Sequence, residues 1–305
     1  MKNTKQIILN FFYFLLLVCG LISCEKEHDV APFEGAVPAN AAQLKFINTA
    51  IGSLGINFGV NMFINDIKSS SVGVTIGLPI GTGHGGIYPI SANYAAVPAG
   101  NQTLKLIMPF RAGIPATATA CPIPESPTTT IATTPLVTEA GKYYSRFLVG
   151  TAPSYSIFEA TDDLSVTNIN QTNAFIRFFN FITNTPVTGY DLVFVRTRPA
   201  TLTTPAITST VKTFLGVRYL GGSPVFEAFI PIPATENIAD VVQLRVAGTT
   251  TVVATVANGF VARPGRVYTF FARGVVGGLT CGMPAATAIP SATANIPVIT
   301  FYTNR

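Results

Sequence analysis

The 305-residue chain contains no tryptophan, two histidines, four cysteines and few charged residues. Asp, Glu, Lys and Arg make up 11% of the sequence, compared with about 25% in typical proteins. The formal net charge is +5 without a basic cluster, which argues against a nucleic-acid partner. The lack of tryptophan removes one of the rings on which sugar-binding platforms rely, so such a platform would have to use Phe or Tyr.

The scarcity of histidine and cysteine restricts catalysis and metal binding. A Ser-His-Asp triad would have to use His84, because His28 lies near the start of the chain, and no G-x-S-x-G elbow accompanies it. Cys121, Cys281 and the two histidines do not have the spacing of zinc ligands. The sequence therefore predicts no catalytic residue, metal site or cofactor, and the protein is not expected to be an enzyme.

A glycine-rich motif and an acidic pair offer alternatives. The segment "GTGHGG" at 81–86 matches G-x-G-x-x-G, but Pro89 and β-branched residues follow where a dinucleotide site needs a helix. We interpret this segment as a hairpin loop. Asp162 and Asp163, with Glu159 nearby, could bind calcium or act on a glycosidic bond. Without an EF-hand pattern, we interpret the pair as part of a solvated linker.

The N-terminus has the pattern of a secretory signal. Lys2 and Lys5 precede an apolar run over 7–22, which is shorter than the roughly twenty residues of a spanning helix. The run ends in "LISC", which resembles the lipobox of bacterial lipoproteins. In that family the thiolate of the cysteine, here Cys24, accepts a diacylglyceryl group.

The lipobox resemblance divides the beginning of the chain. It implies a signal peptide over 1–23, lipid attachment at Cys24 as the first mature residue, and a tether over 24–42. The membrane is then a partner through the lipid anchor. The segment "EKEHD" after Cys24 resembles the surface-export signals of Bacteroidetes lipoproteins, with an ordinary charged tether as the alternative. We expect an outer-membrane lipoprotein, with its periplasmic or external face left open.

Two cysteines remain outside this N-terminal region. Cys121 and Cys281 would lie in an exported, oxidising setting. A disulfide between them and a pair of free thiols both remain open, because the two residues lie far apart in the sequence.

Two halves of the sequence repeat one another. The segment "LKFINTA" from Leu44 matches "IRFFNFI" from Ile176, and "EAGKYYSRFLVG" matches "RPGRVYTFFARG". In an extended chain Leu44 and Phe46 share one face, while Lys45 points the other way. The same order of segments in both halves predicts two similar units.

Strand and turn signals dominate both units. Short alternating runs are separated by prolines, and no stretch has a clear helical period. The sequence predicts an all-β protein with two tandem antiparallel β-sandwich domains of immunoglobulin-like type, over 43–165 and 173–305. We expect most of 110–136, which is rich in Pro and Thr, to be a surface loop.

Several segments together resemble a known bacterial family. They are "LKFINTA", "VNMFINDI", "ISANYAAVPAGNQTLKL" and "AGKYYSRFLVG", and the resemblance covers 43–150 and 174–276. The family is domain of unknown function family 4397. The segment "NMFIND" departs from its usual Asp-Gly turn. The resemblance implies sandwich domains in envelope or secreted proteins and implies no activity.

These observations favour a non-catalytic binding, adhesion or structural module of the cell envelope, with loops 68–87 and 110–136 as contact surfaces. Its partner would be a glycan or another envelope protein. The first alternative is a glycan-binding accessory protein of polysaccharide uptake, in which exposed tyrosines such as Tyr88, Tyr94 and Tyr190 would line the glycan face. The second is a hydrolase, which would require Glu159, Asp162 and His84 to converge in one pocket.

Overall fold

The computed structural model describes residues 38–52, 57–70, 74–75, 78–79, 81–90, 92–113, 125–165, 172–200, 205–221, 228–256, 258–277 and 295–305. Ala39–Arg305 is one compact unit. Cys24, Cys121, Cys281 and His28 lie outside the described residues, so the signal peptide, the lipid attachment and the disulfide stay predictions. Within the described ranges, no helix has the length and apolar character needed to cross a membrane.

The first half of the unit forms two main sheets. The first inner sheet has the order β11-β10-β1-β6, with β7 also paired to β1, and the first outer sheet has the order β3-β2-β8-β9. A short ribbon pairs β4 with β5. The strands are β1 (Ala41–Asn48), β2 (Asn61–Ile64), β3 (Ile67–Lys68), β4 (Val74–Thr75), β5 (Leu78–Pro79), β6 (Ile87–Tyr88), β7 (Ala95–Pro98), β8 (Gly100–Met108), β9 (Thr129–Thr138), β10 (Tyr143–Thr151) and β11 (Ser154–Thr161).

The second half repeats this plan. The second inner sheet has the order β15-β12-β18-β19, and the second outer sheet has the order β14-β13-β16-β17. The strands are β12 (Asn173–Ile182), β13 (Tyr190–Arg198), β14 (Ile207–Val217), β15 (Ile230–Pro233), β16 (Val241–Val246), β17 (Val252–Thr255), β18 (Val267–Gly274) and β19 (Val298–Thr303). No strand ladder joins the two halves in the described part of the chain.

The predicted all-β class is confirmed, with no α-helix among the described residues. Strand direction differs from the prediction, because β1 pairs with β10 and β12 pairs with β18 in parallel. Between the opening and closing strand of each half the chain also visits the outer sheet, and this long connection lets the closing strand run in the same direction as the opening one. The predicted loop 110–136 is wrong from Thr129 onward, where β-branched residues form the edge strand β9.

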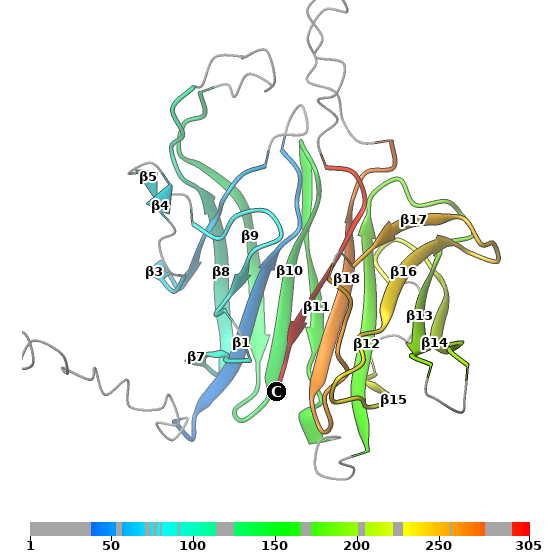
Figure 1. Cartoon of the computed structure of the whole chain (residues 1–305). Coiled ribbons are helices and arrows are strands. Elements are labelled where there is room, and N and C mark those ends of the chain that lie inside the picture. The colour runs from blue at the N-terminus through cyan, green and yellow to red at the C-terminus, as the bar shows by residue number, and fades with distance from the viewer. Residues whose placement is uncertain are drawn as a thin grey trace, which may run out of the picture. The chain divides into compact units, whose positions relative to one another are not determined.

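The four main sheets lie as successive layers (Figure 1), with three large apolar clusters and one smaller cluster packed between them. One cluster fills each half between its inner and outer sheets. The third lies between the two inner sheets, where the Phe147 ring lies within 4.8–5.9 Å of the rings of Phe179, Phe181 and Phe271. The predicted alternation in β1 is confirmed for Leu44 and Phe46, which both enter the first core. The opposite face does not meet solvent, because the second half covers it.

The echoed segments have matching roles in the structure. The Asn48 side chain donates to the backbone oxygens of Phe58 and Thr82, and its own oxygen accepts from a backbone N–H two residues on. Asn180 does the same with the backbone oxygen of Val217 and the N–H of Ile182. Each asparagine thus connects its half's opening strand to the backbone of a neighbouring segment, which explains why Asn recurs in both echoes.

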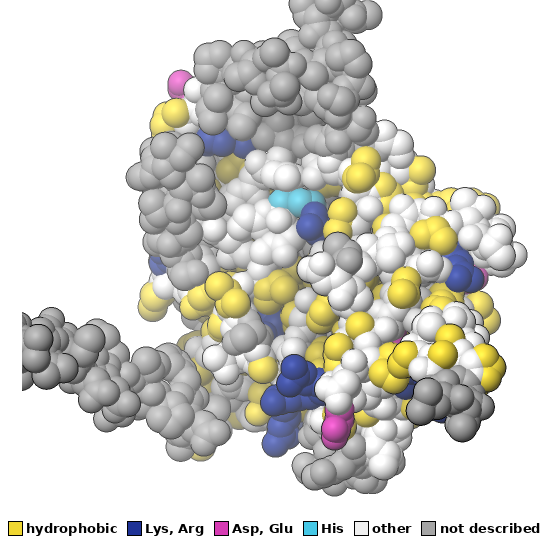
Figure 2. Space-filling view, viewed as in Figure 1, with side chains coloured by type: hydrophobic (Ala, Val, Ile, Leu, Met, Phe, Trp, Pro, Cys, Tyr) yellow, Lys and Arg dark blue, Asp and Glu magenta, His cyan; other side chains and the backbone are white. Residues whose placement is uncertain are grey.

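The outer surface reflects the low charge content. On the face drawn in Figure 2, hydrophobic and uncharged polar side chains cover most of the described area, and Lys and Arg side chains gather at a few separate places. A charged side chain that is buried in such a protein is therefore a point of chemical interest.

Candidate functional site: a charged groove in the first half

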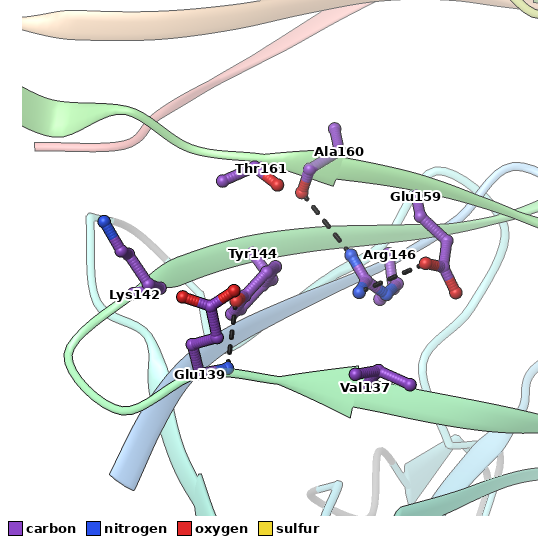
Figure 3. A pocket seen from close by; sticks show the side chains of 8 residues that line it. All are labelled: Val137, Glu139, Lys142, Tyr144, Arg146, Glu159, Ala160 and Thr161. Atoms are coloured by element: carbon purple, nitrogen blue, oxygen red, sulfur yellow. Dashed lines mark hydrogen bonds and ion pairs between the residues drawn. The ribbon is translucent and has the colours of Figure 1, made fainter. Parts of the chain in front are cut away.

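A groove of about 530 Å³ opens between the edge strand β9 and the strands β10 and β11 (Figure 3). It lies where the edge of the first outer sheet faces the edge of the first inner sheet. The side chains that line it come from all three strands and from the turn between β9 and β10. They are Val137, Glu139, Lys142, Tyr144, Arg146, Glu159, Ala160 and Thr161.

Arg146 is the buried charge of this groove. The residue is 2% exposed, and its Nη2 lies 3.3 Å from Oε2 of Glu159, whose side chain is 49% exposed. Its Nη1 lies 3.5 Å from each of the backbone oxygens of Ser145 and Ala160. Burial lowers the pKa of Arg146, while Glu159 acts in the opposite direction. The guanidinium remains charged, because arginine titrates far above neutral pH.

The guanidinium of Arg146 packs against the ring of Tyr144. The centroid of its ring is 5.1 Å from the Arg146 Cζ, a cation–π contact. The Tyr144 hydroxyl accepts a hydrogen bond of 3.0 Å from the backbone N–H of Glu139. Tyr268 in the second half likewise hydrogen-bonds the backbone of Arg263. This tyrosine contact belongs to the fold of both halves, and it fixes the turn that carries Lys142.

The second half shows what the fold itself requires at this place. Arg146 pairs with Glu159 in the β10–β11 ladder, and Phe270 pairs with Phe301 at the same position of the β18–β19 ladder, two residues after the tyrosine in each case. The rings of Phe270 and Phe301 stack at 5.0 Å. The first half therefore has an ion pair where its repeat has an apolar pair, so the strand pairing does not demand these charges.

His84 lies elsewhere, in a turn between the two halves. Its Nδ1 is 2.9 Å from the backbone oxygen of Ala50. Burial, together with the neighbouring Arg273, lowers the pKa of His84 to about 4, although the hydrogen bond to Ala50 acts in the opposite direction. Gly85 has a φ of +74°, and a Cβ there would lie 2.6 Å from Nη2 of Arg273. Strand β6 follows this turn, where a dinucleotide motif would place a helix.

The predicted solvated acidic pair is wrong for Asp162, which is 3% exposed, whereas Asp163 is exposed. Asp162 forms an ion pair with the fully buried Arg177 of the second half. It also accepts hydrogen bonds from the hydroxyls of Tyr94 and Ser145, at 2.5 and 2.7 Å. The carboxylate is buried because these groups replace its water shell.

A polar network surrounds this ion pair between the inner sheets. Asn304 donates to Asp162 at 3.3 Å, and the Tyr302 and Ser145 hydroxyls are 2.9 Å apart. Burial raises the pKa of Tyr302 to about 12. Lys45 is completely buried nearby and donates to the backbone oxygen of Asn93 at 2.7 Å. Burial lowers its pKa to about 8, against the opposing effect of Asp162.

The predicted site residues do not come together. Glu159 contacts Arg146, Asp162 contacts Arg177, and His84 contacts Ala50, in three separate sets of contacts. Tyr190 is 1% exposed and belongs to the core, and the Tyr94 hydroxyl is used by Asp162. Tyr88 packs partly buried against the first core. These tyrosines therefore do not form the exposed glycan face that the sequence suggested.

Sequence reasoning missed the pair of Arg146 and Glu159. A signal was present, because aligning "YYSRFLVG" with "VYTFFARG" places Arg146 opposite Phe270. Within the described residues, no group of three or more His, Cys, Asp or Glu side chains could hold a metal ion.

No protein-family model matches the chain, and no curated protein matches it. A solved structure of a candidate polysaccharide-binding protein (DUF1812) from Bacteroides thetaiotaomicron is 7% identical, covers 77% of this chain and 92% of that chain, and has a TM-score of 0.21. A candidate cell adhesion protein from Parabacteroides distasonis is 8% identical over 87% of this chain and 97% of that chain, with a TM-score of 0.18. TM-scores this low do not establish a shared fold, so the function proposed below rests on this chain's own residues.

Proposed function

We propose that this protein is a non-catalytic binding module of the cell envelope and that the groove beside Arg146 holds its ligand. The observation that carries the proposal is the exchange of Phe270 and Phe301 in one half for Arg146 and Glu159 in the other. This ion pair is weak support for stability, because the desolvation of the buried Arg146 offsets its attraction to the half-exposed Glu159. The second half of the protein has no charges at the matching positions, so the fold does not require Arg146 and Glu159. Their presence in the first half therefore favours a role in recognition.

The groove suits a small polar ligand. Its volume of about 530 Å³ is within the usual range for small-molecule sites. Glu139 and Glu159 offer acceptors, Lys142 and Arg146 offer donors, and Thr161 adds a hydroxyl. Saccharides present many hydroxyl groups that need such partners, so a glycan is the ligand class that we propose. This choice favours glycan binding over purely structural attachment to another envelope protein.

We also infer that Cys24 carries the lipid that attaches the module to the outer membrane. The "LISC" segment, with its resemblance to a lipobox, supports this part of the proposal. Two or three acyl chains give durable attachment, whereas a single chain binds reversibly. Mass spectrometry of the mature N-terminus should find acylated Cys24. Cys24→Ser should release the protein from the membrane fraction, and unchanged partitioning would count against the anchor.

A glycan array probed with the detergent-solubilised full-length chain tests the ligand site. We expect a defined set of glycans to bind, and the double variant Arg146→Phe/Glu159→Phe to lose them all, because it installs the aromatic pair of the second half. The matched control is Asp66→Asn/Lys105→Gln, which removes one charge of each sign from a surface ion pair outside the groove. Binding that survives in the Phe variant would place the ligand elsewhere.

A further inference from the structure

Three arginines in the described part of the chain are more than nine-tenths buried: Arg146, Arg177 and Arg196, with 2%, 0% and 6% exposure. A guanidinium has five N–H donors and no acceptor, so a buried arginine needs several oxygen partners. Comparing the partners of the three shows which of them have donors to spare.

Arg196 is bonded as a structural arginine should be. Its Nε and Nη2 donate to the two oxygens of Asp240 at 2.6 and 2.9 Å, and Nη2 also donates to the backbone oxygen of Pro233 at 2.9 Å. The Asp240 side chain is fully buried. This is the two-pronged geometry that makes Arg–carboxylate pairs strong.

All three side-chain nitrogens of Arg177 also have hydrogen-bond partners. Its Nε donates to the Thr269 hydroxyl at 2.9 Å, its Nη1 donates to the backbone oxygen of Thr161 at 3.1 Å, and its Nη2 donates to Asp162. The Asp162 side chain, like that of Asp240, is completely buried. Neither carboxylate is therefore in contact with solvent.

Arg146 lacks such partners. Its one carboxylate contact, to Glu159, is 3.3 Å long and one-pronged, and its two backbone contacts lie at the 3.5 Å limit of a hydrogen bond. Its buried Nε has no partner among the described residues. The Glu159 side chain is half exposed, so it can rotate into water at little cost. The groove thus contains a buried cation whose present carboxylate partner is replaceable.

We propose that the groove selects an acidic saccharide, whose carboxylate replaces Glu159 as the partner of Arg146. This inference rests on the proposed glycan-binding function and names the ligand class. A ligand carboxylate can accept two parallel hydrogen bonds from the guanidinium, which Glu159 does not. Lys142, exposed in the turn between β9 and β10, adds a second positive charge to the groove. Glu159 then competes with the ligand for the same cation.

Titration calorimetry on the full-length chain in detergent tests this proposal. The probes are oligosaccharides of glucuronate, galacturonate and N-acetylneuraminate, each compared with its own methyl ester, which has no negative charge. We expect at least one acid to bind about tenfold or more tightly than its ester, because charge-assisted pairs are roughly twice as strong as neutral hydrogen bonds. Binding should weaken as salt is added. Inorganic sulfate serves as a competitor, to distinguish a saccharide site from a general oxyanion site.

Two variants distinguish an effect on ligand selection from an effect on folding. Glu159→Gln should raise the affinity for the acid several-fold, because it removes the competing charge from a half-exposed position. Arg146→Lys should lower the affinity even where the fold is kept, because an ammonium group cannot form the two-pronged contact. Glu236→Gln, the matched control at an exposed position of the second half, should not change the affinity.

The inference is overturned if no acid binds more tightly than its ester, if Glu159→Gln weakens binding, or if sulfate binds as tightly as the best saccharide. A neutral glycan that binds wild type and is lost from the Phe double variant would then leave the proposed function in place. If no glycan binds at all, the proposed function fails together with the inference.

Discussion

Asp162 illustrates how much one carboxylate can do when it is buried. It is the only carboxylate that contacts Arg177 in the described residues, and both side chains are completely buried. We therefore expect Asp162→Asn to lower the free energy of unfolding by about 3–5 kcal/mol, because an unpaired guanidinium would remain in the interior. Urea denaturation measures this loss. The neighbouring Asp163→Asn, at an exposed position, should change it by less than about 0.5 kcal/mol.

The burial of Lys45 predicts that the stability of the protein rises with pH in the alkaline range. Its pKa is lowered from 10.5 to about 8 in the folded state, so above about pH 8 the folded protein loses this proton while the unfolded chain keeps it. Stability then rises with pH, and the contribution should be about 1–2 kcal/mol between about pH 8 and about pH 9.5. Below pH 8 the full cost of the buried charge is present.

Unfolding of Lys45→Met across the same pH range checks this assignment. The variant keeps most of the apolar stem and removes the amine, so its stability should no longer rise in this window. Lys68→Met, at an exposed position of β3, should behave as wild type does. An unchanged rise in Lys45→Met would assign the effect to another group.

At the scale of elements, the matching ladders β10–β11 and β18–β19 differ in one pair of residues, which is charged in the first and aromatic in the second. The double variant Arg146→Phe/Glu159→Phe gives the first half the aromatic pair of the second. Arg146 is buried while Glu159 is half exposed, and replacing an ion pair that costs desolvation by apolar side chains that fit is often neutral or stabilising. We expect this variant to unfold at equal or higher urea concentration while losing ligand, and a marked loss of stability would show that the fold needs the charges.

The strands were largely predictable, because alternation in segments such as "LKFIN" fixes which residues face the core. Strand direction was not predictable, since a sequence does not show that the chain visits the outer sheet between β1 and β10. The sequence predicts a loop where most of strand β9 lies, because Pro135 and many threonines obscure the alternation, although an edge strand tolerates proline. The role of Arg146 needed the three-dimensional comparison of the two ladders, since a basic residue in a strand usually points to solvent.

At the scale of the whole molecule, the contact between the two inner sheets decides how the protein unfolds. Phe147 is completely buried against rings from the other half. We expect Phe147→Ala to cost about 3–5 kcal/mol and calorimetry to show one transition for both halves. Val137→Ala, which removes an exposed apolar side chain, should be nearly silent. Two separated transitions would show that the halves unfold independently.

The domain bounds 43–165 and 173–305 remain a prediction. The polar residues around Asp162 predict a solvated linker between two domains. In the structure, Asp162 and Arg177 form a buried ion pair between the halves. One aspartate in a polar stretch looks like any linker residue, and only its partner, fifteen residues further along the chain, shows that it is an interior group.

The placement of β1 determines how this protein responds to traction. Any tension transmitted through the residues that precede Ala39 enters β1, which lies between β10 on one side and β6 and β7 on the other. Because β1 and β10 run in parallel from Gln43 to Asn48, a pull along β1 loads their hydrogen bonds in shear, all at once, and does not peel them apart singly. The opening strand is thereby built to resist mechanical extraction.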